Sequence, residues 1–256
     1  MGRILAGIVM LLLLAATVLS GEPDGQPTRL PLPIGVMALD EAKLSYFNQC
    51  LEPEDQIMFP AEHADAMAKV AKAQKGIMIR GQEFAKAEQI IASGKEKGAS
   101  HAAFNLEGPI PVAEIVRQQQ AVYTLARKAG MSYTFAPTVV NLRQYYKDFV
   151  PHADILVLQS QRYQTDADYK ELVTGLIANI KKANPRVRVW VQVSVNPPGN
   201  RDISAAAVLR CIHDIAGTAD GICLFYHPTR WATLQAVMTQ LRPLPDKDRH
   251  PDDQGL

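Results

Sequence analysis

The sequence predicts a compact (β/α)₈ barrel that follows an N-terminal secretion signal. Eight short apolar runs alternate with longer amphipathic runs between residues 34 and 245. Strict alternation of strands and helices predicts parallel strands joined by right-handed crossovers. Eight such units in about 210 residues match a barrel at the compact end of its size range. An open doubly wound sheet is the weaker alternative, because the chain has no GxGxxG or GxxxxGK[ST] phosphate turn.

Residues 1–20 have the pattern of a removable secretory signal. Arg3 supplies the positive start, and the apolar run from Ile4 to Leu19 is short for a membrane span. Ser20 and Gly21 supply the small residues of a cleavage site, and no Cys follows that could carry a lipid. We therefore expect a secreted or periplasmic protein with no stable membrane anchor after signal cleavage.

A Pro-rich lead-in over residues 21–33 precedes the barrel, which we place at residues 34–245, and a charged tail over 246–256 is expected to be disordered. Apolar spacing of three and four residues between the strands predicts a helix after each one. The expected strands are Ile34–Ala38, Gln56–Phe59, Gly76–Arg80, Ala102–Glu107, Ser132–Pro137, Asp154–Gln161, Val187–Val195 and Gly221–Tyr226.

Composition narrows the function class. The formal net charge of +1 gives no electrostatic argument for nucleic acid or an anionic membrane. The chain has no HExxH motif and no G-x-S-x-G nucleophile elbow, so we expect no metal and no cofactor. Cys50, Cys211 and Cys223 are an odd number; buried free thiols are favoured, and a disulfide between two of them stays open. The oligomeric state is also left open.

The fourth expected strand carries the strongest signal for a site. Asn105 and Glu107 point to the same face of this apolar strand, because alternate residues of a strand share a face. An ionised Glu facing inward is costly unless it is paired or functional. Active sites of such barrels lie at the carboxyl ends of the strands. We therefore place Glu107 and Asn105 at a catalytic centre.

Other strand ends add mainly neutral polar groups. In the seventh strand the valines take the face toward the helices, so Gln192, Ser194 and Asn196 are predicted to point into the barrel. Amides and hydroxyls beside aromatic rings suit an uncharged, polyhydroxylated ligand, so we expect a carbohydrate. The predicted binding residues are Arg80, Gln159, Gln161, Gln192, Ser194, Asn196, Tyr226 and His227.

The tripeptide Asn105-Leu106-Glu107 on a secreted barrel resembles a glycoside hydrolase signature. Chitinase-type enzymes end their fourth strand in D-x-D-x-E, and endo-β-N-acetylglucosaminidases have N-x-E there. The resemblance implies that Glu107 is a general acid and that Asn105 orients the acetamido group of the substrate, which acts as the nucleophile. Ala103 departs from the chitinase pattern, since an Asp is expected there. The chain also resembles uncharacterised bacterial secreted proteins with an NLE…AP…Q-x-Q…QVS-x-NP pattern.

Three other interpretations stay open at this point. Glu107 could form a structural ion pair with Arg80 or Arg162, and the glutamines could form a closed network in the barrel. The same polar mouth could bind a carbohydrate without cleaving it. A lyase or isomerase could use Glu107 as a base. A two-carboxylate mechanism needs a second acid, for which only Glu62 and Asp202 are candidates.

Overall fold

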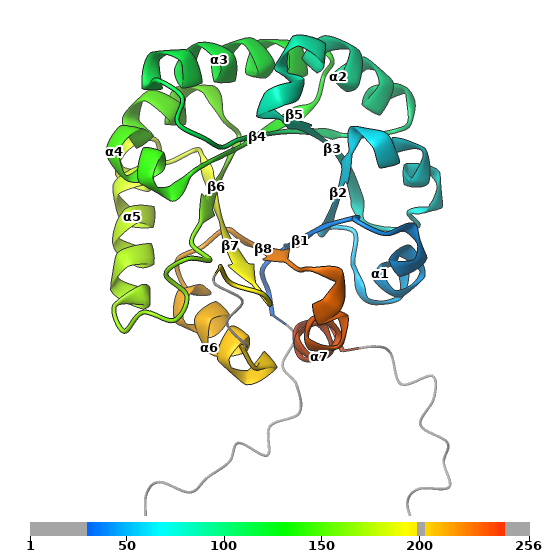
Figure 1. Cartoon of the computed structure of the whole chain (residues 1–256), viewed down its shortest axis with the longest axis vertical. Helices are drawn as coiled ribbons and strands as arrows, with labels where there is room; N and C mark the ends of the chain where they lie inside the picture. Colours follow the sequence, from blue (N-terminus) through cyan, green and yellow to red (C-terminus); the bar gives the residue numbers. More distant parts are fainter. Residues whose placement is uncertain (1–29, 199–202, 244–256) are drawn as a thin grey trace, which may run out of the picture.

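A computed structural model describes residues 30–198 and 203–243 of the chain. Eight parallel strands pair in sequence order and close when β8 pairs with β1, which confirms the predicted (β/α)₈ barrel (Figure 1). The predicted signal peptide, residues 21–29 of the lead-in, the tail and Asp202 lie outside the described residues. Their roles therefore stay predictions.

Each strand begins and ends within two residues of its predicted bounds. The alternation in β7 shows why the strands form: Val189, Val191 and Val193 are fully buried against the helices, whereas Trp190 and Gln192 face the lumen. The strands are β1 (Ile34–Met37), β2 (Gln56–Pro60), β3 (Gln74–Arg80), β4 (His101–Leu106), β5 (Ser132–Pro137), β6 (Ile155–Gln159), β7 (Arg188–Ser194) and β8 (Gly221–Phe225).

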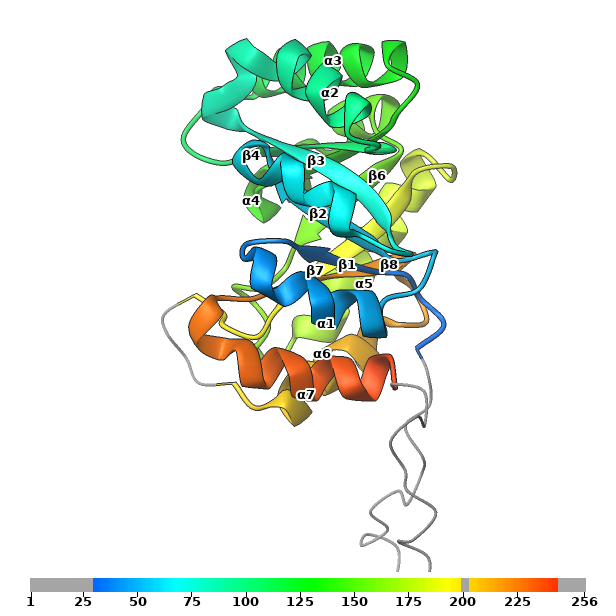
Figure 2. The same cartoon turned by 90° about the vertical axis from the view of Figure 1, so that its right-hand side faces the viewer.

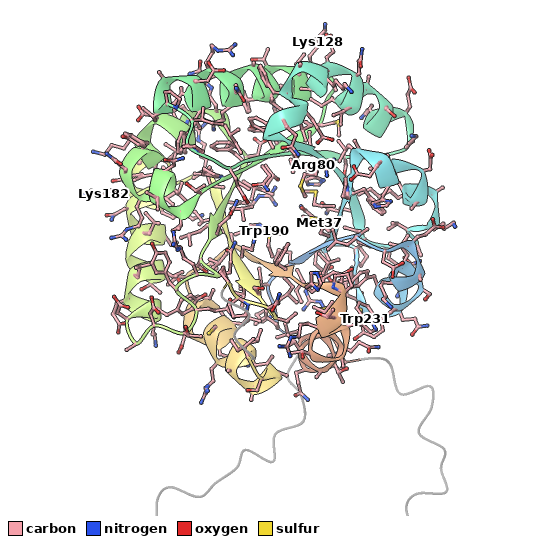
Figure 3. All side chains as sticks on the ribbon, in the orientation of Figure 1. Met37, Arg80, Lys128, Lys182, Trp190 and Trp231 are labelled. Carbon is pink, nitrogen blue, oxygen red and sulfur yellow. The ribbon has the colours of Figure 1, made fainter. Side chains whose placement is uncertain are left out.

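The helices surround the barrel, and each packs an apolar stripe against it (Figures 1 and 2). Figure 3 shows the resulting division, with Lys128 and Lys182 pointing outward and Trp190 lying inside the barrel. The α-helices are α1 (Leu44–Cys50), α2 (Ala87–Glu96), α3 (Val112–Lys128), α4 (Val139–Phe149), α5 (Tyr169–Ala183), α6 (Ala205–Ile215) and α7 (Trp231–Leu241).

One predicted helix is absent from the described part of the chain. The connection from β2 to β3 contains a 3₁₀-helix, Ala61–Lys69, instead of an α-helix. The connection is short, and a 3₁₀-helix rises about 2.0 Å per residue against about 1.5 Å in an α-helix. The nine residues of this segment therefore return the chain along the barrel within fewer residues. A 3₁₀-helix, Gly81–Lys86, also precedes α2.

A buried ion pair fastens the base of the barrel, at the amino ends of the strands. Asp55, just before β2, accepts hydrogen bonds from Arg242 Nη2 at 2.7 Å and from the backbone N–H of Ile34 at 2.7 Å. Arg242 follows α7 and also donates to the carbonyl of Leu30 at 2.7 Å. Both side chains are almost fully buried. The pair thus joins the last helix to the first two strands.

Within the described ranges, 30–198 and 203–243, no helix is long and apolar enough to cross a membrane.

Candidate functional site

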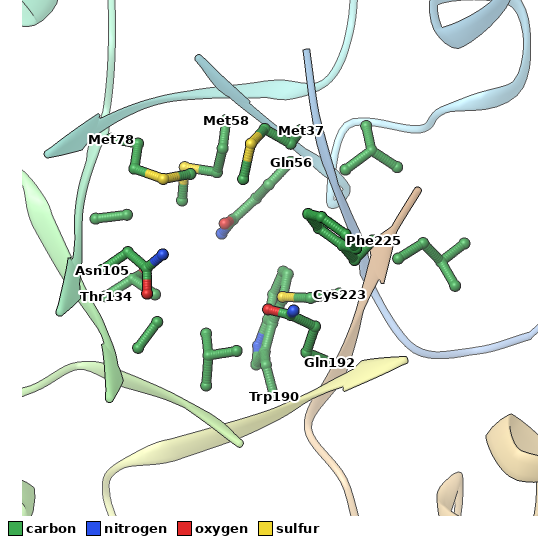
Figure 4. Close-up of a pocket in the computed structure, with 16 residues that line it drawn as sticks. Met37, Gln56, Met58, Met78, Asn105, Thr134, Trp190, Gln192, Cys223 and Phe225 are labelled. Atoms are coloured by element: carbon green, nitrogen blue, oxygen red, sulfur yellow. The ribbon is translucent and has the colours of Figure 1, made fainter. Parts of the chain in front are cut away.

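A pocket opens in the lumen of the barrel, where such folds usually pack a solid core (Figure 4). The volume of this cavity is about 80 Å³, and the cavity is open to solvent. The inward positions Ala103 and Ala136 carry small residues, which leaves part of the lumen unfilled. The lining is Gly35, Val36, Met37, Gln56, Met58, Met78, Ala103, Asn105, Thr134, Ala136, Val157, Trp190, Gln192, Cys223, Leu224 and Phe225. None of these side chains is charged.

The indole ring of Trp190, on β7, fills the part of the lumen next to β8 and β1. A Cβ atom at Gly221 would lie 2.4 Å from the indole, and one at Gly35 would lie 2.9 Å from it. These two glycines therefore make room for the ring. Trp190 packs with Ile155 and Val157 in a small apolar cluster that is separate from the main core. Its part in the pocket was not predicted from the sequence.

The predicted catalytic pair does come together at the mouth of the barrel. Asn105 Nδ2 donates to Glu107 Oε1 at 3.2 Å, and Gln159 Nε2 donates to Asn105 Oδ1 at 2.9 Å. Gln159 Nε2 also donates to the carbonyl of Ala136 at 3.1 Å, which fixes the orientation of its amide. Glu107 lies just after β4 and is exposed, whereas Gln159 is buried. The carboxylate is thus held from below by two amides in series.

Arg80 ends β3 next to Asn105 but is bound to two carboxylates. Its Nη2 lies 3.0 Å from Glu62 Oε2 and 2.7 Å from Glu83 Oε1. The hydrogen bond from Arg80 lowers the pKa of the Glu83 carboxyl. This arrangement engages the guanidinium predicted to bind ligand, and it also holds Glu62, the predicted second acid, in an ion pair.

The predicted polar groups of β7 divide into two sets. Gln192 lines the pocket. Ser194 is fully buried, and the Gln164 amide makes two hydrogen bonds to its backbone. Gln164 Nε2 donates to the Ser194 C=O at 2.9 Å, and the Ser194 N–H donates to Gln164 Oε1 at 2.8 Å. The Ser194 hydroxyl accepts from the N–H of Asn196 at 2.9 Å. Ser194 and Asn196 therefore shape the turn after β7 and do not line the pocket.

Three further predicted binding residues lie outside the pocket. Gln161 follows the end of β6 in a turn. Tyr226 is buried between Phe47 and Trp231, and burial raises the pKa of its phenol to about 12. His227 is exposed, and its ring nitrogen accepts from the N–H of Thr229 at the start of a 3₁₀ turn. The placement of Tyr226 is a correction: the side chain points toward the helices, because it follows the inward Phe225 on the strand.

Two polar atoms that line the lumen have no hydrogen-bond partner among the described residues. They are the hydroxyl of Thr134 and the indole Nε1 of Trp190. Buried polar groups in native proteins are nearly always paired, so each such exception needs an explanation. Both atoms are buried, and Trp190 Nε1 faces Gly221, where a Cβ atom would lie 2.7 Å from it.

The lining also restricts the chemistry. No lysine lines the pocket, so the lumen offers no amine for an imine with a carbonyl substrate. Among the residues described, no group of three or more His, Cys, Asp and Glu side chains could hold a metal ion. All three cysteines are free, as favoured from the sequence, and burial raises the pKa of the Cys223 thiol to about 12.

Neither the protein-family profiles nor the curated protein sequences contain a match to this chain. Solved structures do share its fold. An aldolase called QR15 superposes with a TM-score of 0.52 at 11% identity, over 77% of this chain and 90% of its own. Deoxyribose phosphate aldolase from Aeropyrum pernix gives 0.51 at 12% identity, over 75% and 84%. A protein assigned as a deoxyribose-phosphate aldolase from Toxoplasma gondii ME49 gives 0.56 at 11%, over 83% and 92%.

These similarities show the barrel fold, and they correct the glycoside hydrolase hypothesis. The neighbours are aldolases, which belong to the lyases, and the expectation that Glu107 acts as the acid of a glycosidase was wrong. The N-x-E tripeptide is too short to identify a family. A carboxylate at a strand end with an amide partner can serve several kinds of proton transfer, so the tripeptide does not identify a glycosidase.

Proposed function

We propose that this protein is a lyase or isomerase of small neutral hydroxycarbonyl compounds, with Glu107 as the base. Glu107 removes a proton from a carbon next to the carbonyl group; the C–H electron pair forms a C=C bond, and the C=O π pair moves to the oxygen, which gives an enolate. The protonated Glu107 exchanges its proton with solvent. It then protonates the enolate at the former carbonyl carbon, which gives the isomer, or it protonates a hydroxyl group on the β-carbon, which leaves as water as the enolate pair forms the new C=C bond. The structural neighbours are aldolases, which are lyases with the same fold, and this favours the proposed class.

The hydrogen-bonded series Gln159, Asn105 and Glu107 carries the proposal. Each amide in it is oriented by the next, so the Asn105 N–H meets a carboxylate that is otherwise free to approach a ligand. A base must be held within hydrogen-bond reach of the proton it removes, and this series provides that orientation. The amide of Gln192, near the carboxyl end of β7, lines the pocket and is suited to bind the developing enolate oxygen.

The lining favours a neutral substrate. The lining has no cation that could pair with a phosphate group. A phosphorylated compound such as the deoxyribose phosphate of the neighbouring aldolases would need one. Arg80 stands at the rim, but its charge is shared between Glu62 and Glu83.

The test is deuterium incorporation from D₂O, followed by ¹H NMR. The panel contains dihydroxyacetone, glyceraldehyde, ribose and 2-deoxyribose, each with the wild type and with Glu107→Gln. We expect at least one compound to lose its α-proton signal with the wild type, and at least a 100-fold slower loss with the variant, as general base catalysis contributes about 10²–10⁴-fold.

Glu88→Gln is the matched control, because Glu88 is an exposed carboxylate on α2. It should exchange at the wild-type rate. Equal exchange by wild type and Glu107→Gln, or no exchange with any compound, would contradict the proposal.

A barrel that binds a neutral ligand without transforming it is the second candidate. It is favoured by a lining that holds amides and apolar groups but neither a lysine nor a charged group. The predicted carbohydrate ligand belongs here. Saturation-transfer NMR with the same panel distinguishes the two, since a pure binding protein keeps its signals in Glu107→Gln and shows no exchange in either form.

A further inference from the structure

Four consecutive strands each bring a sulfur atom to the pocket. They are β8 with Cys223, β1 with Met37, β2 with Met58 and β3 with Met78. The whole chain has only eight methionines and three cysteines in 256 residues. Three methionines and one cysteine among the sixteen lining residues are therefore a concentration that composition does not account for.

The backbone brings the three thioethers close to one another. Met37 and Met58 are register partners on neighbouring parallel strands. The Met58 sulfur lies against Gly76, because a Cβ atom at that glycine would be only 2.1 Å from it. Gly76 and Met78 share the inward face of β3, two residues apart. Met58 thus reaches from β2 across to the foot of Met78.

Figure 4 shows the outcome. The sulfur atoms of Met37, Met58 and Met78 gather on one side of the pocket, and Cys223 and Gln192 lie on the opposite side. Met37 and Met58 are only half-buried although they lie inside the barrel, so the open pocket reaches them. Met78 is more deeply buried, with 7% of its surface exposed.

We propose that Met37, Met58 and Met78 form a binding site for a soft monovalent metal ion, Cu(I) or Ag(I). Thioethers are soft, uncharged donors that select Cu(I) over hard divalent ions. No charged side chain lines the pocket to balance the charge of a bound ion. Burying a single positive charge there costs less free energy than burying two, which favours a monovalent ion. The site is independent of the role proposed for Glu107.

The experiment is calorimetric titration with Ag(I) in chloride-free buffer, repeated by competition of Cu(I) with a chromophoric chelator. The protein carries Cys50→Ala, Cys211→Ala and Cys223→Ser throughout, so that no free thiol can supply the signal. We expect one equivalent of each ion to bind. Met58→Leu/Met78→Leu should weaken binding at least tenfold, while the Leu side chains keep the apolar volume.

Met67→Leu is the matched control, because Met67 is fully buried outside the pocket. It should bind as the parent does, and circular dichroism should show every variant folded. Equal affinity in the parent and in Met58→Leu/Met78→Leu would overturn the proposal. Absence of any binding in the parent would overturn it as well.

Discussion

Two carboxylates at opposite ends of the barrel show how differently the fold treats the same chemical group. Asp55 at the base is fully buried and accepts hydrogen bonds from Arg242 and from the backbone N–H groups of Ile34 and Glu52. Glu107 at the mouth is exposed, and among the described residues its hydrogen-bond partner is the amide of Asn105, at 3.2 Å. A carboxylate with all its oxygens engaged serves stability, and one with free oxygens is available for chemistry.

The comparison predicts its largest effect at the base. Asp55→Asn leaves the Arg242 charge buried beside a neutral amide, which should cost about 3–5 kcal/mol of unfolding free energy. Urea unfolding followed by circular dichroism measures this loss. Glu88→Gln, at an exposed pair, should change stability by less than about 0.5 kcal/mol. A loss at Asp55 as small as the loss at Glu88 would remove the distinction between the two ends.

A second effect at the base depends on pH. His101 is buried at the start of β4, and burial lowers the pKa of its imidazole to about 4. The neutral ring is therefore favoured in the folded state, so its stabilisation is complete above the unfolded pKa of about 6.5 and is lost as the pH falls toward 4. Between pH 7.5 and 5 the wild type should lose about 2 kcal/mol more than His101→Gln. Parallel urea curves for the two proteins would contradict this assignment.

At the mouth, Asn105→Ala should reduce the exchange rate about tenfold, because Glu107 then loses its one amide contact. Its effect on stability should stay near about 1 kcal/mol, the usual contribution of a hydrogen bond. The measurement is deuterium exchange beside urea unfolding. A variant that unfolds easily but exchanges normally would place Asn105 with the structural residues.

The smallest effect concerns Gln159, which acts through Asn105. Gln159→Leu should lower the exchange rate about threefold without changing the apparent substrate affinity, since the base is loosened and the pocket is kept. A changed affinity with an unchanged rate would instead assign Gln159 to binding.

The sequence predicted the barrel well because strands and helices have local signals. The valine alternation of β7 and the turn residues between elements fixed the strand bounds to within two residues. The prediction of an α-helix between β2 and β3 was wrong. The short connection contains a 3₁₀-helix, which spans more distance per residue, and the local pattern does not show this. The Asp55–Arg242 pair joins residues 187 positions apart and leaves no local signal.

The site was predicted in part, for the same reason. The spacing of Asn105 and Glu107 is local, and the structure does bring them together. Tyr226 was predicted to face the pocket, but the side chain before it, Phe225, faces the pocket instead. The sequence of β8 alone did not show which of these two neighbours points inward. The thioethers of Met37, Met58 and Met78 were missed, since each looks like ordinary core filling and only barrel closure brings their strands together.

The central claim is that the mouth carries chemistry while the base carries stability, and one ratio tests it most directly. This ratio is the rate of deuterium incorporation by the wild type divided by that of Glu107→Gln, with the compound that exchanges fastest. We predict a ratio of at least about 100, with equal unfolding midpoints for the two proteins. A ratio near one would contradict the account.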